Sequence, residues 1–192
     1  MRFVPLALLA ACSSKPPSTQ PVIGFAQVSS TPPLDDARVG FFRALADSGY
    51  VRDSNIKVME RNAQGDIPTL ALIMSDFVNQ GATHIAAVSS VATQAALKSI
   101  TDRPVIFGAV ANPYVIGAGT SPANHRANVT GEEIPLPVDS AMVLAHDAFP
   151  TVKVWGTLFD PADPFAEFYL ETAKAVTKMA GLKLVTVACT GP

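Results

Sequence analysis

Short apolar runs alternate with longer segments of helical periodicity from residue 21 onward, and this alternation constrains the fold more than any other feature. The apolar runs are rich in β-branched residues and predict strands over residues 21–28, 56–59, 84–88, 104–107, 152–159 and 182–188. Segments between these runs place apolar residues on one helical face and predict helices over residues 34–49, 70–78, 91–99, 138–148 and 165–180. Strands that alternate with helices in this way predict βαβ units, and therefore an α/β fold with a parallel sheet.

The predicted strands are almost continuously apolar, which is typical of a parallel sheet that is covered on both faces. In such sheets ligands bind beyond the carboxyl ends of the strands. We therefore expect a site in the loops that follow the strands. A long connection rich in Gly, Pro and Asn, residues 108–128, marks a change of layer or of domain.

Charge and composition exclude several classes of protein. The chain has 192 residues, with 14 Lys and Arg against 16 Asp and Glu, and this balance offers no basic surplus for a nucleic acid. Hydrophobic residues make up 48% and charged residues 16%, so the chain is not of the polar, highly charged kind that stays disordered. Two cysteines do not build a disulfide scaffold.

The first residues have the pattern of a targeting signal. One basic residue, Arg2, precedes the apolar run 3–11, which is too short to span a bilayer. Positions 9–12 read Leu-Ala-Ala-Cys, which resembles a bacterial lipobox, so we expect residues 1–12 to be a lipoprotein signal peptide with Cys12 as the lipidated residue. Residues 13–21 are then a flexible tether. There are two alternatives. One is an ordinary signal peptide in which the cysteine is incidental, and the other is that the segment is a buried strand.

Other reactive or aromatic residues fit structural roles. With Cys12 lipidated, Cys189 has no disulfide partner, and its place after an apolar run predicts a buried small hydrophobic residue. Trp155 lies inside a predicted strand and is expected in the core. The three histidines are not spaced as metal ligands, so no metal site and no cofactor are predicted. They are His84, His125 and His146.

Serines follow two of the predicted strands, directly before helices. They are Ser29 and Ser30 after the first strand, and Ser89 and Ser90 after the third. Their hydroxyl groups, together with the exposed N–H groups at the start of a helix, suit a carboxylate. The alternative is helix capping, which serine performs routinely.

The loops also carry a resemblance to a known family. The ordered pieces are Leu34-Asp35 with Gly40-Phe41, the run Asn62-Ala63-Gln64-Gly65-Asp66, and Asn128-Val129-Thr130-Gly131 leading to a helix. In this order and spacing they resemble the uncharacterised-type substrate-binding proteins of ABC transporters, some of which bind aromatic amino acids. The resemblance runs from residue 22 to the C-terminus. It implies the type I periplasmic binding protein fold, in which two Rossmann-like lobes close on a ligand, with residues 22–131 as the N-terminal ligand-binding lobe and 132–192 as the beginning of the second.

The resemblance further implies contacts with the ligand. Ser90 stands where the family has a threonine that contacts the ligand, and Asn112 stands where it usually has aspartate. In the second lobe the family usually has Tyr-Asn-Pro, then a glutamate and an Asn-Ser pair, but this chain has Phe-Asp-Pro at 159–161, then Asp163 and Phe-Ala at 165–166. A less polar ligand, or a lobe that closes with different contacts, is therefore as plausible as an amino acid. The candidate ligand-binding residues are Ser29, Ser30, Ser89, Ser90, Asn112, Asp160 and Asp163.

These observations predict a substrate-binding lipoprotein of an ABC importer, located in the periplasm or at the cell surface and held to a membrane by its lipid. We expect it to be no enzyme, to capture a small molecule, with an aromatic or other hydrophobic amino acid as one candidate, and to deliver it to a membrane permease. One alternative is a ligand-sensing domain of the same fold. The other is an α/β enzyme whose catalytic residues lie beyond residue 192.

The length of the chain leads to one more expectation. Residues 22–131 supply a whole lobe, whereas 132–192 supply only a helix, a strand, a helix and a strand of the second. A doubly wound lobe does not close with so few elements. We therefore expect a C-terminally truncated reading frame that exposes an apolar sheet face in its second lobe and binds its ligand poorly.

Overall fold

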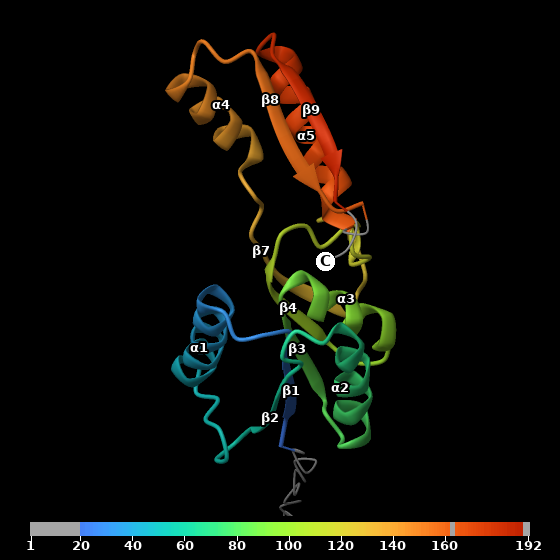
Figure 1. Cartoon of the computed structure of the whole chain (residues 1–192). Helices are drawn as coiled ribbons and strands as arrows, with labels where there is room; N and C mark the ends of the chain where they lie inside the picture. The colour runs from blue at the N-terminus through green and yellow to red at the C-terminus, as the bar shows by residue number, and fades with distance from the viewer. Residues whose placement is uncertain (1–19, 162–163, 190–192) are drawn as a thin grey trace, which may run out of the picture.

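The computed structural model describes residues 20–161 and 164–189, and five parallel strands form one sheet in its larger part (Figure 1). The strand order is β2-β1-β3-β4-β7. The strands are β1 (Val22–Gln27), β2 (Lys57–Asn62), β3 (His84–Val88), β4 (Val105–Val110) and β7 (Val129–Glu133). This order places β1, β3 and β4 inside the sheet, with their carboxyl ends side by side.

Helices cover both faces of this sheet. They are α1 (Pro32–Asp47) on one face, and α2 (Ile67–Asn79) and α3 (Ser90–Ser99) on the other (Figure 1). On the α1 face, the rings of Phe41 and Phe42 lie 5.5 and 5.0 Å from the ring of Phe25. On the other face Phe77 of α2 is fully buried, and a Cβ built on Gly24 would lie 2.5 Å from its ring, so only glycine fits there. The continuous apolar character of the strands follows from this double coverage.

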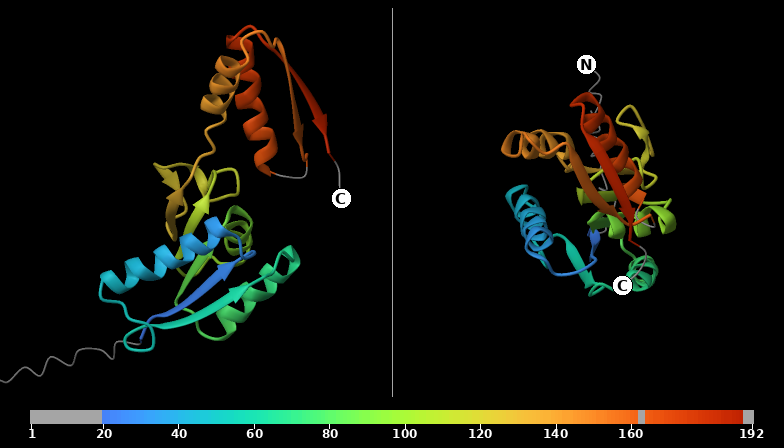
Figure 2. Two further views of the ribbon diagram at one scale, coloured as in Figure 1. Left: turned by 60° about the vertical axis from the view of Figure 1, so that its left-hand side comes forward. Right: turned by 45° about the horizontal axis from the view of Figure 1, so that its top comes forward.

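A smaller part stands beyond the carboxyl ends of these strands, joined by the linker 134–137 (Figure 2). Its elements are α4 (Val138–Ala148), β8 (Val154–Phe159), α5 (Pro164–Met179) and β9 (Lys183–Ala188). β8 and β9 pair in parallel, and α5 packs against both and against α4. Leu170 and Ala173 of α5 are buried, whereas Leu158 and Val187 on the opposite side of the strands are 71% and 52% exposed. One face of this two-stranded sheet is therefore open and apolar.

The sequence pattern does not predict β7, which the structure adds at the edge of the larger sheet beside β4. Its residues after Val129 are Thr-Gly-Glu-Glu, and all four are exposed. An exposed edge strand does not need the apolar run by which a central strand is recognised. The predicted long connection at 108–128 is also not wholly irregular, because it contains a small hairpin of β5 (Gly119–Ser121) and β6 (Asn124–His125).

Two predicted strands end too early, and two predicted burial states are wrong or incomplete. β2 continues to Asn62 and β4 to Val110, so both strands run further toward the loops than expected. Cys189 is exposed rather than buried, and it follows the last residue of β9, in which the four residues beyond Leu184 are exposed. Trp155 is half-buried rather than a full core residue.

Some predictions concern residues that the structure does not describe. These are the signal peptide at 1–12 with Cys12, most of the tether at 13–21, and Asp163. Within the described ranges, every helix is too short or too polar to pass through a bilayer.

Candidate functional site

A hollow of about 610 Å³ lies between the larger part and the smaller one, and a second hollow of about 410 Å³ adjoins it. We call this inter-part hollow the cleft. From the larger part it is lined by the first turns of α2 and α3 and by the connection after β4, with the residues Ile67, Ser90, Val91, Gln94, Ala111 and Ile116. The linker and the smaller part contribute Leu136, Asp160, Phe165, Ala166 and Tyr169.

The lining of the cleft is mostly apolar, with a few polar groups. The polar side chains are those of Ser90, Gln94, Asp160 and Tyr169. No lysine, arginine or histidine is found among the described residues of the lining. The N-terminal ends of α2 and α3, whose first residues, Ile67 and Ser90, border the cleft, carry the partial positive charge of a helix N-terminus. A binding site with an apolar wall and a few placed polar groups is the usual form for a small organic ligand.

Two adjacent serines at the start of α3 have different roles. Ser89 is the buried N-cap, and its Oγ accepts a hydrogen bond of 3.2 Å from the backbone N–H of Ala92. Ser90 is half-buried, lines the cleft, and its Oγ accepts a hydrogen bond of 3.3 Å from the backbone N–H of Ala111. Since this bond uses a lone pair of the oxygen, the hydroxyl hydrogen of Ser90 stays available to an acceptor in the cleft.

Ser29 and Ser30 lie outside the cleft lining. The hydroxyl of Ser30 donates to Asp35 Oδ1 at 3.3 Å and accepts from the Asn62 amide at 3.4 Å. The buried side chain of Gln27 donates to the same Asp35 oxygen and to the carbonyl of Ser29, both at 2.7 Å. Ser30 borders a separate charged hollow of about 430 Å³ over the ends of β1 and β2.

Of the remaining predicted residues, one lines the cleft and one does not. Asp160 follows β8 and lines the cleft. The Asn112 side chain accepts hydrogen bonds from the backbone N–H groups of Tyr114 and Val115, at 3.0 and 3.3 Å, and so stabilises the turn after β4. Asp163 falls outside the described residues.

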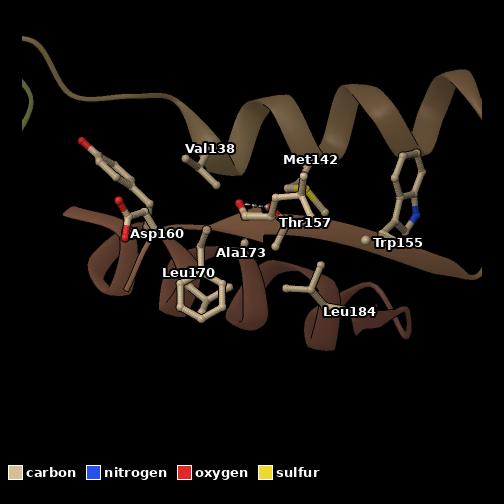
Figure 3. Close-up of a pocket in the computed structure, with 13 residues that line it drawn as sticks. Val138, Met142, Trp155, Thr157, Asp160, Leu170, Ala173 and Leu184 are labelled. Atoms are coloured by element: carbon tan, nitrogen blue, oxygen red, sulfur yellow. Dashed lines mark hydrogen bonds between the residues drawn. The ribbon is translucent and has the colours of Figure 1, made fainter. Parts of the chain in front are cut away.

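The adjoining hollow of about 410 Å³ lies inside the smaller part, between α4 and α5 and over β8 (Figure 3). Figure 3 shows Met142 of α4 on one side of this hollow and Leu170 and Leu184 on the other. Its lining is mainly apolar, but the ring nitrogen of Trp155 at one end is buried without a hydrogen-bond partner. Asp160, Ala166 and Tyr169 line both hollows.

Sequence reasoning does not identify Gln94, Leu136 or Tyr169. Tyr169 lies one turn after Phe165 in a helix with regular apolar spacing, and such a position usually indicates core packing. Leu136 lies in the linker between two prolines, where no regular pattern exists. The residue type of Tyr169 is the one sequence feature that could have indicated its place in the cleft. A tyrosine has an apolar ring and a polar hydroxyl, and it tends to lie where the ring is buried and the hydroxyl can form a hydrogen bond.

One ion pair lies at the opposite end of the strands from the cleft. Asp102 and Arg103 precede β4, at the amino end of the strands, and the Arg103 guanidinium donates to both carboxylate oxygens. This hydrogen bonding holds the pKa of the Asp102 carboxyl below its usual value. Among the described residues there is no cluster of three His, Cys, Asp or Glu side chains that would hold a metal ion.

Comparison with known proteins gives a consistent result. The profile of the family described as ABC transporter substrate binding protein matches residues 22–191. A tyrosine-binding protein from Clostridioides difficile (strain R20291) is 32% identical over 163 residues, which are 85% of this chain and 47% of that protein. The chain thus spans about half the length of this curated relative.

Two solved structures share the fold. One is an ABC domain from Streptococcus pneumonia in complex with L-Trp, with 27% identity, a TM-score of 0.80, and coverage of 89% of this chain and 58% of that one. The other is a ligand-free, open structure of a substrate-binding protein with adhesive properties from Clostridium difficile, with 29% identity, a TM-score of 0.70 and the same coverage of both chains.

Proposed function

The chain belongs to the ABC transporter substrate-binding protein family, with the α/β fold of the type I periplasmic binding proteins, and on this premise we propose that it captures an aromatic or other hydrophobic amino acid for an ABC importer. Members of this family are extracytoplasmic binding proteins and not enzymes. In our proposal the ligand binds in the cleft between the two parts, and the loaded protein delivers it to a membrane permease.

The observation that carries this proposal is the cleft itself, with Ser90 at the start of α3 on one side and Asp160 on the other. A helix N-terminus and a serine hydroxyl suit the ligand carboxylate, and the Asp160 carboxylate suits its ammonium group. The apolar side chains of Ile67, Val91 and Phe165 then receive an apolar or aromatic side chain. The relatives that bind tyrosine or carry L-Trp support the same class of ligand.

We further propose that residues 22–131 form the N-terminal ligand-binding lobe and that residues 132–192 belong to the second lobe. The parts meet at the linker 134–137, which is the natural place for a hinge. Lipid attachment at Cys12, after a signal peptide at 1–12, would hold the protein at the membrane beside its permease. If replacing Cys12 with serine leaves the protein in the membrane fraction, the lipid anchor is wrong.

The amino-acid proposal is tested by calorimetry with L-tyrosine, L-tryptophan and L-leucine, together with two truncated forms of tyrosine. Tyramine lacks the carboxylate and 3-(4-hydroxyphenyl)propionate lacks the ammonium group, and we expect both to bind more weakly than L-tyrosine. Hydrogen bonds to charged groups contribute about 1.5–3 kcal/mol, so Ser90→Ala should weaken L-tyrosine binding about 10- to 100-fold.

Ser99→Ala is the matched control, because Ser99 is exposed at the opposite end of the same helix. The Ser99→Ala variant should bind L-tyrosine with the same affinity as the unsubstituted protein. Equal affinity of the Ser90→Ala variant, or of tyramine and L-tyrosine, would show that the carboxylate does not bind at α3.

A further inference from the structure

Three hydrogen bonds in series connect the start of α3 to the smaller part. The backbone N–H of Ala111 donates to Ser90 Oγ, the hydroxyl of Tyr169 donates to the carbonyl of Ala111, and the backbone N–H of Leu136 donates to the hydroxyl oxygen of Tyr169. Each donor–acceptor distance is 3.3 Å. All four residues line the cleft, so a ligand there lies against every member of the series.

The Tyr169 hydroxyl occupies a special position in this series. Tyr169 belongs to α5 of the smaller part, whereas Ala111 follows β4 of the larger part and Leu136 lies in the linker. A phenol hydroxyl has one hydrogen to donate and accepts in return, and here both capacities are used. One oxygen atom therefore ties α5 to the larger sheet and to the linker at the same time.

Ala111 is held from both sides. Its N–H is fixed by Ser90 and its carbonyl by Tyr169, so its orientation depends on both side chains. Ala109, two residues earlier at the end of β4, has a positive φ of 53°, a conformation that non-glycine residues seldom adopt. A ligand that accepts the free hydrogen of Ser90 fixes the rotamer of that side chain and thereby the place of Ala111.

We propose that Tyr169 is a positioning residue that couples occupancy of the cleft to the seating of the smaller part on the larger part, an inference that rests on the proposed function. Binding at Ser90 places the Ala111 carbonyl for the Tyr169 hydroxyl, and the Tyr169 bond in return keeps Ala111 and Ser90 in the arrangement that the ligand uses. Such coupling is reciprocal, because both contacts favour the same arrangement of the two parts.

The first test is Tyr169→Phe, which keeps the ring and removes only the hydroxyl. We expect L-tyrosine to bind about 3- to 10-fold more weakly, mainly through faster dissociation. The double variant Ser90→Ala/Tyr169→Phe should bind no more than about twofold more weakly than Ser90→Ala alone, because both changes break one series. Tyr114→Phe is the control, since Tyr114 does not line the cleft, and it should have no effect. Effects that multiply in the double variant would overturn the coupling.

The second test needs no ligand and measures the distance between the two parts. Spin labels are placed at Lys98→Cys on α3 and Lys178→Cys on α5, two exposed positions, in a full chain with Cys12→Ser and Cys189→Ser. Tyr169→Phe should broaden the distribution of label distances, and L-tyrosine should narrow it in the parent protein only. Identical distributions with and without the Tyr169 hydroxyl would overturn the inference.

Should the parent protein bind none of the amino acids, the proposed function fails, while the ligand-free label distances still decide the role of Tyr169.

Discussion

At the scale of single residues, the backbone is unusual at the carboxyl ends of three strands of the larger sheet. Gln64, Ser89 and Ala109 all have positive φ, at 53°, 98° and 53°. Gln64 and Ser89 follow β2 and β3, and Ala109 is the residue before the last one of β4. Non-glycine residues pay for this conformation, and such residues gather at functional sites. Ser89, with φ 98° and ψ 154°, lies in a region that is almost confined to glycine. The strain is therefore stored at the start of α3, directly beside Ser90.

Two substitutions at Ser89 separate this strain from its capping role. Ser89→Ala keeps the strained backbone and loses the hydrogen bond to Ala92, which should lower the free energy of unfolding by about 0.5–2 kcal/mol. Ser89→Gly relieves strain of about 1–3 kcal/mol, and glycine is nearly as good an N-cap as serine. We expect the glycine variant to be more stable than the alanine variant by about 1–3 kcal/mol in urea denaturation. If alanine is equal or better, then the backbone at Ser89 is not strained.

At the scale of elements, α2 shows how one face of a helix carries the stability of the larger part. Leu70, Ile73, Met74 and Phe77 are buried against the sheet, and their spacing is that of a single helical face. Leu72, on the same helix, is 70% exposed. Two leucines two residues apart thus have opposite environments.

The matched substitutions Leu70→Ala and Leu72→Ala test this assignment. Leu70→Ala removes a fully buried side chain and leaves a cavity, so the free energy of unfolding should fall by about 2–5 kcal/mol. Leu72→Ala removes an exposed side chain, and its effect should stay within about 0.5 kcal/mol. Chemical denaturation of both variants measures the difference. Similar losses would mean that α2 presents a different face to the sheet.

The elements also show what the sequence can predict. The apolar alternation predicts β1, β3, β8 and the helices closely, because burial requires an apolar pattern with a defined period. It does not predict β7, whose exposed edge position imposes no such pattern. It places the ends of β2 and β4 too early, because Asn62 and Gly108 look like loop residues.

The candidate site follows the same rule. Ser90 and Asp160 are predictable because both lie directly after strands, where the fold gathers ligand contacts. Ser30 has equivalent sequence features, but its hydrogen bond to Asp35 and its position over β2 place it in the neighbouring hollow. The position of Tyr169 in the cleft depends on how the smaller part packs on the larger part, and no local sequence pattern encodes that packing.

At the scale of the whole molecule, the core is distributed unevenly. The larger part has an apolar cluster on each face of its sheet, with β1, β3 and β4 buried between helices. In the smaller part, α4 has no buried residue among those described, and the buried apolar residues of α5 are Leu170 and Ala173. Regions with few buried contacts open with a smaller free energy than the global unfolding of a protein. The two parts should therefore differ in local stability although they belong to one chain.

Hydrogen exchange followed by mass spectrometry tests this difference. Amides of β1, β3 and β4 should exchange only when the larger part unfolds, whereas those of β8 and β9 should exchange through local opening. If the free energies of these two openings differ by about 2.8 kcal/mol, the exchange rates differ about 100-fold. β7 is the internal comparison, because it is an edge strand like β8 and β9 but belongs to the larger sheet. If β7 exchanges as fast as β8, then edge position governs the rates, and if β8 exchanges as slowly as β3, then the smaller part has a stability that its few buried residues do not explain.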